Sequence, residues 1–269
     1  MPSYISRSKE IFSRSMTAAI ASLVLSLALA APAVADQADA KRLLKAMSDY
    51  LAAQQSISFD YDAILGVVTD EGQNLEIASS GSVVLGRPDK IRVTRHGGFA
   101  DVEMNFDGKT MTILGKGINM YTQIEAPGSI DNLVEVMRNQ YGRPLPAADL
   151  VTSNAYGTLM QQVTDIKDLG SGVIGGIECD WLAFRSNEVD WQIWIAQGEQ
   201  PYPCRFVITS KTIAGNPQYS IQTSKWVGSA EAATTDFSFT NSSNAEKVEP
   251  EDLEGSGDLP ANFLLGESQ

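Results

Sequence analysis

The sequence predicts a mainly β protein with a few helices, built on one antiparallel sheet. From residue 56 onward, apolar and polar residues alternate with a period of two in short runs, the pattern of strands with one buried face. Tight turns join the runs and leave no room for the helical crossovers that parallel strands need. We count about a dozen such runs, and helical patterns occur at the start and in the middle of the chain.

Residues 1–35 are expected to be a secretory signal peptide. Basic residues precede a short apolar run, and Ala-Val-Ala at 33–35 supplies an A-x-A cleavage site, so cleavage is expected between Ala35 and Asp36. A buried helix or an anchor is the alternative, but the apolar run is short for a membrane span and no cysteine follows it to carry a lipid. We therefore expect a soluble periplasmic protein without a transmembrane segment after signal removal.

The exported part of the chain is strongly acidic. The formal net charge of the whole chain is −13, and removing the signal segment, with three basic residues and one acidic residue, leaves a charge near −15. This charge argues against nucleic acid and against anionic membrane surfaces as primary partners. A solvated acidic surface is enough to explain it.

Two segments carry a helical pattern. Apolar residues recur on one stripe of residues 36–54. Ser129 is expected to cap a helix in which Leu133 and Met137 share a face, and Leu150 falls in one or two further helical pieces before residue 164. These segments are the candidate cover for the apolar face of the sheet.

The composition changes near the C-terminus. The stretch beyond Asn241 is rich in acidic residues and poor in core-forming ones. Residues 245–269 are therefore expected to form an acidic, mostly disordered tail. One folded domain is expected over residues 36–244.

The hairpin around residues 186–189 gives the candidate functional wall. If "SNEV" turns this hairpin, one face of its two strands carries a Trp181–Trp194 cross-strand pair. The other face then forms a continuous apolar wall of five residues: Leu182, Phe184, Trp191, Ile193 and Ile195.

No motif in the sequence indicates a catalytic or metal site. Residues 170–175 match G-x-G-x-x-G, but a strand follows them where a nucleotide site needs a helix, so we interpret them as a hairpin turn. His96 is the sole histidine, and no G-x-S-x-G is present. We expect no enzyme activity, no cofactor and no metal; a hydrolase of unfamiliar type is the alternative.

Cys179 and Cys204 form an even pair in an exported chain, which favours a disulfide. In a flat meander both would lie opposite Ala196 at roughly 9–10 Å, whereas a disulfide needs Cα atoms within about 7 Å. The bond therefore requires a bulge or a kink around Pro201 and Pro203. We expect the bond to form.

Five stretches of the chain resemble a family of predicted periplasmic proteins with a domain of unknown function. They are "RPDKIRV" (87–93), "FDGKTMTIL" (106–114), "YGRPLPAADLV" (141–151), "CDWLAFR" (179–185) and "VDWQIWIAQGEQPYPCRFVIT" (189–209). The resemblance covers roughly residues 40–245. It implies the fold of the lipoprotein carriers LolA and LolB, which is a curved, incomplete antiparallel barrel of about eleven strands with helices covering its concave side. The chain departs from that pattern in lacking a LolB-type lipid-attachment cysteine and in its acidic tail.

The resemblance implies a binding or carrier protein, since the concave face of those carriers holds acyl chains. The five wall residues would then line an apolar cavity, and Leu133, Met137 and Leu150 would belong to lid helices. The expected partner is a lipid, an acyl chain or a lipidated protein. The alternative is a structural or interaction protein whose half-barrel is filled by its own helices. The sequence does not separate the two, because side chains that fill a groove and side chains that line one look alike.

Overall fold

The computed structural model describes residues 37–98, 101–141, 145, 147–250 and 252 of the chain. All of them belong to one compact unit, Ala35–Gln269. The predicted signal segment and the cleavage position between Ala35 and Asp36 lie outside the described residues.

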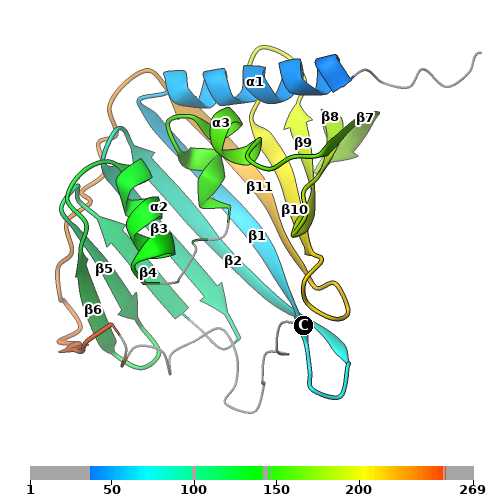
Figure 1. Ribbon diagram of the computed structural model, residues 1–269. Coiled ribbons are helices and arrows are strands. Elements are labelled where there is room, and N and C mark those ends of the chain that lie inside the picture. Colours follow the sequence, from blue (N-terminus) through cyan, green and yellow to red (C-terminus); the bar gives the residue numbers. More distant parts are fainter. Residues whose placement is uncertain (1–36, 99–100, 142–144, 146, 251, 253–269) are drawn as a thin grey trace, which may run out of the picture. The chain divides into compact units, whose positions relative to one another are not determined.

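Among the described residues, twelve strands form one sheet in the order β12-β6-β5-β4-β3-β2-β1-β11-β10-β9-β8-β7 (Figure 1). Neighbouring strands are antiparallel except β12, which pairs with β6 in parallel. The predicted fold class, a large, open and curved antiparallel sheet, is confirmed. The strands are β1 (Ser56–Val68), β2 (Asn74–Gly86), β3 (Lys90–Gly97), β4 (Asp101–Phe106), β5 (Thr110–Gly115), β6 (Met120–Glu125), β7 (Asp165–Ile174), β8 (Ile177–Arg185), β9 (Val189–Ala196), β10 (Pro203–Ser210), β11 (Gln218–Ser229) and β12 (Glu246–Lys247).

Turn chemistry places the junction between β4 and β5 as the sequence predicts. Gly108 has a φ of +93° between β4 and β5, so the Asp-Gly hairpin is confirmed. The glycine-rich segment differs in detail from the prediction. Residues 170–174 continue β7, and the turn into β8 is made by Gly175 and Gly176 alone.

A tyrosine lies against a glycine at the centre of the sheet. Tyr61 of β1 is directly opposite Gly81 of β2. Its hydroxyl donates a hydrogen bond of 3.0 Å to the carbonyl oxygen of Thr94 in β3. The ring therefore crosses β2 at Gly81, where a side chain would collide with it. This contact ties three adjacent strands together.

Four helical pieces lie on one face of the sheet, here called the inner face (Figure 1). They are α1 (Gln37–Ala53), α2 (Ile130–Asn139), the 3-10 turn η1 (Ala148–Val151) and α3 (Ala155–Leu159). Ser129 caps α2, as predicted, by accepting a hydrogen bond from the Asn132 amide. Apolar side chains of these helices and of the inner face form one continuous core.

The end of the described chain contains a segment outside the sheet and corrects the predicted domain boundary. The stretch "DFSFT" (236–240), which alternates like a strand, pairs with no strand of the described chain. Together with residues 241–243, of which 242 and 243 form a turn, it makes up a segment that we call the strap. The predicted domain boundary at residue 244 is too early, because Ala245 is buried and Glu246–Lys247 form β12 against β6. Of the predicted tail, residues 251 and 253–269 lie outside the described residues.

Truncation tests the corrected boundary. Ending the chain after Asn244 removes the hydrogen bonds from the Glu246 amide to Asn119 and from the Val248 amide to Tyr121. We expect this truncation to lower the free energy of unfolding by about 1–2 kcal/mol in urea denaturation. A chain ending after Asp252 keeps both bonds and is the control. Equal stability of the two truncated chains would contradict the corrected boundary.

Candidate functional site

The hairpin of β8 and β9 has the predicted register. Phe184 lies opposite Trp191 and Leu182 opposite Ile193, with Trp181 opposite Trp194 on the other face. The five wall residues therefore share the inner face, and each is between 0 and 5 % exposed. The wall exists as one surface.

Aromatic contacts organise this wall. The rings of Phe184 and Trp191 are stacked, with centroids 3.8 Å apart and an interplanar angle of 7°. The rings of Phe206, from β10, and Trp191 are in edge contact, with centroids 5.8 Å apart and an interplanar angle of 62°. Trp191 is thus held between two neighbouring strands, and it contributes more contact area than the aliphatic residues beside it.

The predicted lid residues lie in the same core. Leu133, Met137 and Leu150 are all buried within the apolar cluster that contains the wall. The inner face is therefore filled by the protein's own helices in this structure. Whether the wall and the lid residues take part in binding stays a prediction.

The covering segments α2, η1 and α3 are joined to one another and to α1 by polar contacts. Arg138 of α2 forms an ion pair of 2.6 Å with Asp149 of η1. Asp131 of α2 accepts hydrogen bonds from the amide and hydroxyl of Ser153. The Tyr156 amide of α3 donates to the Ser48 hydroxyl of α1 at 3.0 Å. The cover is thus a connected layer of short pieces.

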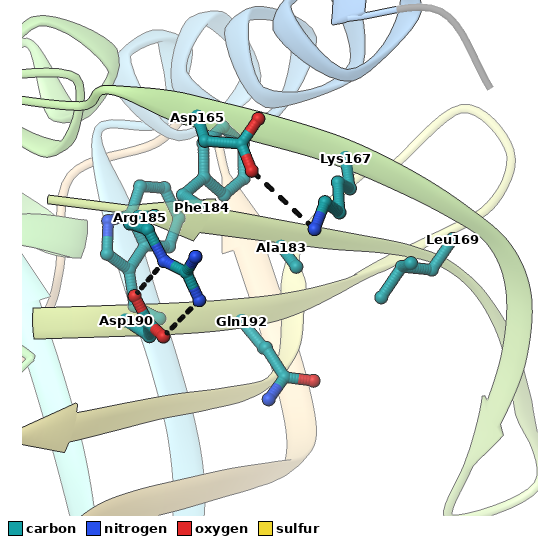
Figure 2. Close-up of a pocket in the computed structure, with 9 residues that line it drawn as sticks. Asp165, Lys167, Leu169, Ala183, Phe184, Arg185, Asp190 and Gln192 are labelled. Atoms are coloured by element: carbon teal, nitrogen blue, oxygen red, sulfur yellow. Dashed lines mark hydrogen bonds and ion pairs between the residues drawn. The ribbon is translucent and has the colours of Figure 1, made fainter. Parts of the chain in front are cut away.

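On the outer face, a hollow of about 240 Å³ lies over β7, β8 and β9 (Figure 2). Figure 2 shows Arg185 facing Asp190 on one side, joined by hydrogen bonds of 2.9 and 3.0 Å, and Asp165 beside Lys167 on the other. The hydrogen bond from Arg185 lowers the pKa of Asp190. Sequence reasoning missed this hollow. The alternating charges of "DIKD" at 165–168 were its one local signal.

A second hollow, of about 600 Å³, lies between the outer face of β3–β5 and the strap, and we call it the strap pocket. At its floor, Glu103 forms ion pairs with Arg92 at 2.5 Å and with Lys116 at 3.0 Å, and the side chain of Glu103 is only 13 % exposed. Burial alone would raise the pKa of Glu103, but hydrogen bonds from Lys116, Asn105 and Arg92 outweigh burial and lower it. Sequence reasoning missed this group as well.

The lowered pKa of Glu103 predicts a pH dependence. A carboxylate with a depressed folded pKa stabilises the protein above its unfolded pKa of about 4.3, and this contribution is lost as the pH falls through the folded pKa. We expect Glu103→Gln to be less stable than the parent at pH 7 and to lose less stability between pH 7 and pH 3 in urea denaturation. Glu76→Gln, at an exposed position of β2, is the matched control. Parallel acid profiles for the parent and Glu103→Gln would contradict the role of the carboxylate.

A β-bulge next to Cys204 brings the two cysteines together, as a disulfide between them would require. The pairing of β9 with β10 shifts between Pro203 and Arg205, and Cys179, Ala196 and Cys204 form a small buried cluster. Both cysteines are free thiols in the structure. Burial raises the pKa of both, and of Cys204 most. The disulfide stays a prediction.

Thiol counting decides between the two states of the cysteines. In protein prepared by export, denatured and left unreduced, we expect no reactive thiol, because the bulge brings the two cysteines into one small buried cluster. After reduction and refolding, we expect both thiols to react slowly in the folded protein, since burial keeps them protonated and covered. Two reactive thiols per exported chain before reduction would show that the disulfide prediction is wrong.

Other chemistry is sparse in the part of the chain that the structure describes. No group of three or more His, Cys, Asp and Glu side chains there has the geometry of a metal site. His96 lies exposed on β3, with Nδ1 3.1 Å from a carboxylate oxygen of Asp101. None of the described helices combines the length and the apolar character needed to cross a membrane.

Comparison with known proteins gives one family. Residues 40–250 match the model of a family described as "Predicted periplasmic protein (DUF2092)". No curated protein sequence matches the chain significantly.

The chain is also similar to several solved structures, at TM-scores below 0.5. An uncharacterized conserved protein from Thermus thermophilus shares 12 % identity, with a TM-score of 0.45 over 78 % of this chain and 99 % of that one. The lipoprotein LppX from Mycobacterium tuberculosis shares 15 %, with a TM-score of 0.38 over 75 % and 100 %. A LolA superfamily protein from Nitrosomonas europaea shares 10 %, with a TM-score of 0.33 over 74 % and 97 %.

Proposed function

Because the chain belongs to the DUF2092 family of predicted periplasmic proteins, we propose that it is a periplasmic binding protein whose inner face takes up the acyl chain of a lipid or of a lipidated partner. The family membership confirms the resemblance found in the sequence and the periplasmic location expected from it. The proposed role is binding without catalysis.

One observation carries the proposal. The apolar wall on β8 and β9 shares one core with separate helical pieces, of which α1 packs against β7 and β9, and no second sheet covers the wall within the described residues. The polar contacts described above join these helical pieces to one another, and the residues that they share with the wall in the core are apolar. An acyl chain can replace such contacts without leaving a polar group unpaired.

The energy available is enough for useful affinity. Burying ten methylene groups of an acyl chain contributes about 8 kcal/mol before the costs of association and of ordering the chain. Moving the cover exposes some apolar surface of its own and reduces this gain. A long acyl chain is therefore favoured over a short one, and no ionic contact is needed.

The proposal is tested on protein purified from its own periplasm. Native mass spectrometry is expected to show a co-purified lipid, and the delipidated protein is expected to bind palmitate saturably, as followed by tryptophan fluorescence. Hexanoate, with the same headgroup and a short chain, is the control ligand and is expected to bind far more weakly.

A second candidate follows from the burial of the wall. If no lipid co-purifies and palmitate does not bind, the helices simply fill the half-barrel. The outer Trp181–Trp194 pair, stacked at 5.4 Å with Arg205 5.9 Å from the centre of the Trp194 ring, would then be the candidate contact surface for a protein partner.

A further inference from the structure

The strap pocket is a candidate binding site separate from the inner face. Arg92, Asn105, Thr112 and Gln123 lie in one row across β3–β6, and this row alternates with the residues that enter the core. The pocket therefore opens on the face opposite the apolar wall. Its volume of about 600 Å³ is within the range of small-molecule sites. We propose that the strap pocket binds a small neutral polyhydroxylated molecule, a mono- or disaccharide.

The charges that line the pocket favour a neutral ligand. Arg92 and Lys116 bring two positive charges, and Glu103 and Asp236 bring two negative ones. Both oxygens of Glu103 are engaged by these cations, and Asp236 accepts hydrogen bonds from the amide and hydroxyl of Ser238. The formal charges cancel, so neither an anion nor a cation gains from the net charge of the lining.

A buried amide supplies an unused acceptor. Asn105 lines the pocket and is 4 % exposed. Its Nδ2 donates to Glu103 at 3.2 Å, which fixes the orientation of the amide, and its Oδ1 has no partner within the described part of the chain. An unpaired buried acceptor destabilises the protein, because it has lost its hydrogen bonds to water. A ligand hydroxyl that enters beneath the strap and reaches Oδ1 would recover this cost.

The roof of the pocket offers groups that match sugar hydroxyls. Ser238, Thr240, Ser242 and Ser243 all line it, and each hydroxyl both donates and accepts, as a sugar hydroxyl does. Phe239 and Leu114 add an apolar surface for the C–H face of a sugar ring. Such a combination of several hydroxyl groups and one aromatic ring suits a carbohydrate better than an acyl chain.

The strap is held in a way that lets it admit a ligand. The ring of Phe239 contacts Tyr121 at 4.9 Å, and Asn119 reaches the carbonyls of residues 243 and 244 at 3.5 Å. Across the pocket itself, no hydrogen bond within the described residues joins the strap to Arg92, Glu103 or Asn105. Residues 236–242 of the roof can therefore shift over these three residues while the bonds of Asn119 hold residues 243 and 244.

Sugar titration of the full exported protein tests the proposal. We use glucose, galactose, N-acetylglucosamine and maltose in isothermal titration calorimetry, and we expect saturable binding of at least one with a Kd of about 1 mM or below. Asn105→Leu is expected to weaken that binding about tenfold, because it removes the buried acceptor. Ser242→Trp, at an exposed roof position, is expected to abolish binding by occupying the pocket. Lys167→Met, in the other outer hollow, is the matched control and is expected to bind normally.

Each outcome decides the proposal. Loss of binding in Ser242→Trp with normal binding in Lys167→Met supports it, and this pair decides even if Asn105→Leu fails to fold. Failure of all four sugars to bind, or equal binding by the parent and Ser242→Trp, overturns it. Binding of sulfate or of free arginine at the pocket in place of the sugars also overturns it, since the site would then select a charge. Acyl-chain binding on the opposite face is independent of all these results.

Discussion

Replacing Trp191 by alanine is expected to lower the free energy of unfolding by about 3–5 kcal/mol. The side chain is almost fully buried, stacks on Phe184 and receives the edge of Phe206, so its removal leaves a cavity at the centre of the wall. Urea denaturation followed by circular dichroism measures the change without relying on tryptophan signals. If the inner face binds acyl chains, the variant is also expected to bind palmitate more weakly than the parent.

Trp194→Ala is the matched control, since it lies three residues away on the same strand and faces outward. Trp194 is partly exposed and stacks on Trp181, so we expect a loss of about 0.5–1.5 kcal/mol and normal palmitate binding. Equal effects of the two substitutions on palmitate binding would contradict the assignment of the wall. A stability loss in Trp191→Ala with no palmitate binding by the parent would favour the filled half-barrel.

Gly81→Ala is expected to destabilise the sheet by about 3 kcal/mol or more. A methyl group at this position would lie 1.9 Å from the carbonyl oxygen of Thr94 and 2.7 Å from the Tyr61 ring. The ring can rotate away, but the Thr94 oxygen belongs to the backbone of the next strand, so the strands themselves must separate. Thermal and urea denaturation measure the loss.

Gly117→Ala provides the control for Gly81→Ala. A methyl group at Gly117 would meet nothing within 4 Å, and we expect a change of no more than about 0.5 kcal/mol. Similar losses for the two substitutions would mean that the close approach at Gly81 is not what limits the sheet.

Features with a local cause could be predicted from the sequence. The Ser129 cap fixes the start of α2, and the two-residue period around the "SNEV" turn fixes which residues face Trp191. Each depends on neighbours within a few positions along the chain. The residues of the wall could therefore be named one by one from the amino-acid sequence.

Features made by distant segments could not be predicted. Phe237 and Phe239 alternate as in a strand, but both rings pack against the sheet. Phe237 lies beside Gly86 and Phe239 against Tyr121, without backbone pairing of this segment to a strand of the described sheet. The strap pocket joins residues 92–119 to residues 236–243, and no local pattern connects them. The sequence also could not predict that helices fill the inner face, because Leu133 and Met137 would be apolar in a lid and in a core alike.

The pairing of β1 with β11 has a consequence for how the chain folds. Within the described sheet, every other antiparallel neighbour follows its partner directly along the chain, so β1–β6 and β7–β11 are two meanders that can form from local contacts. Only β1 with β11 brings together residues as far apart as Ser56 and Ser229. Closing so long a loop costs more chain entropy than any single hairpin. We therefore expect the joining of the two meanders to be the slow step of folding, and this seam to be where the sheet first comes apart.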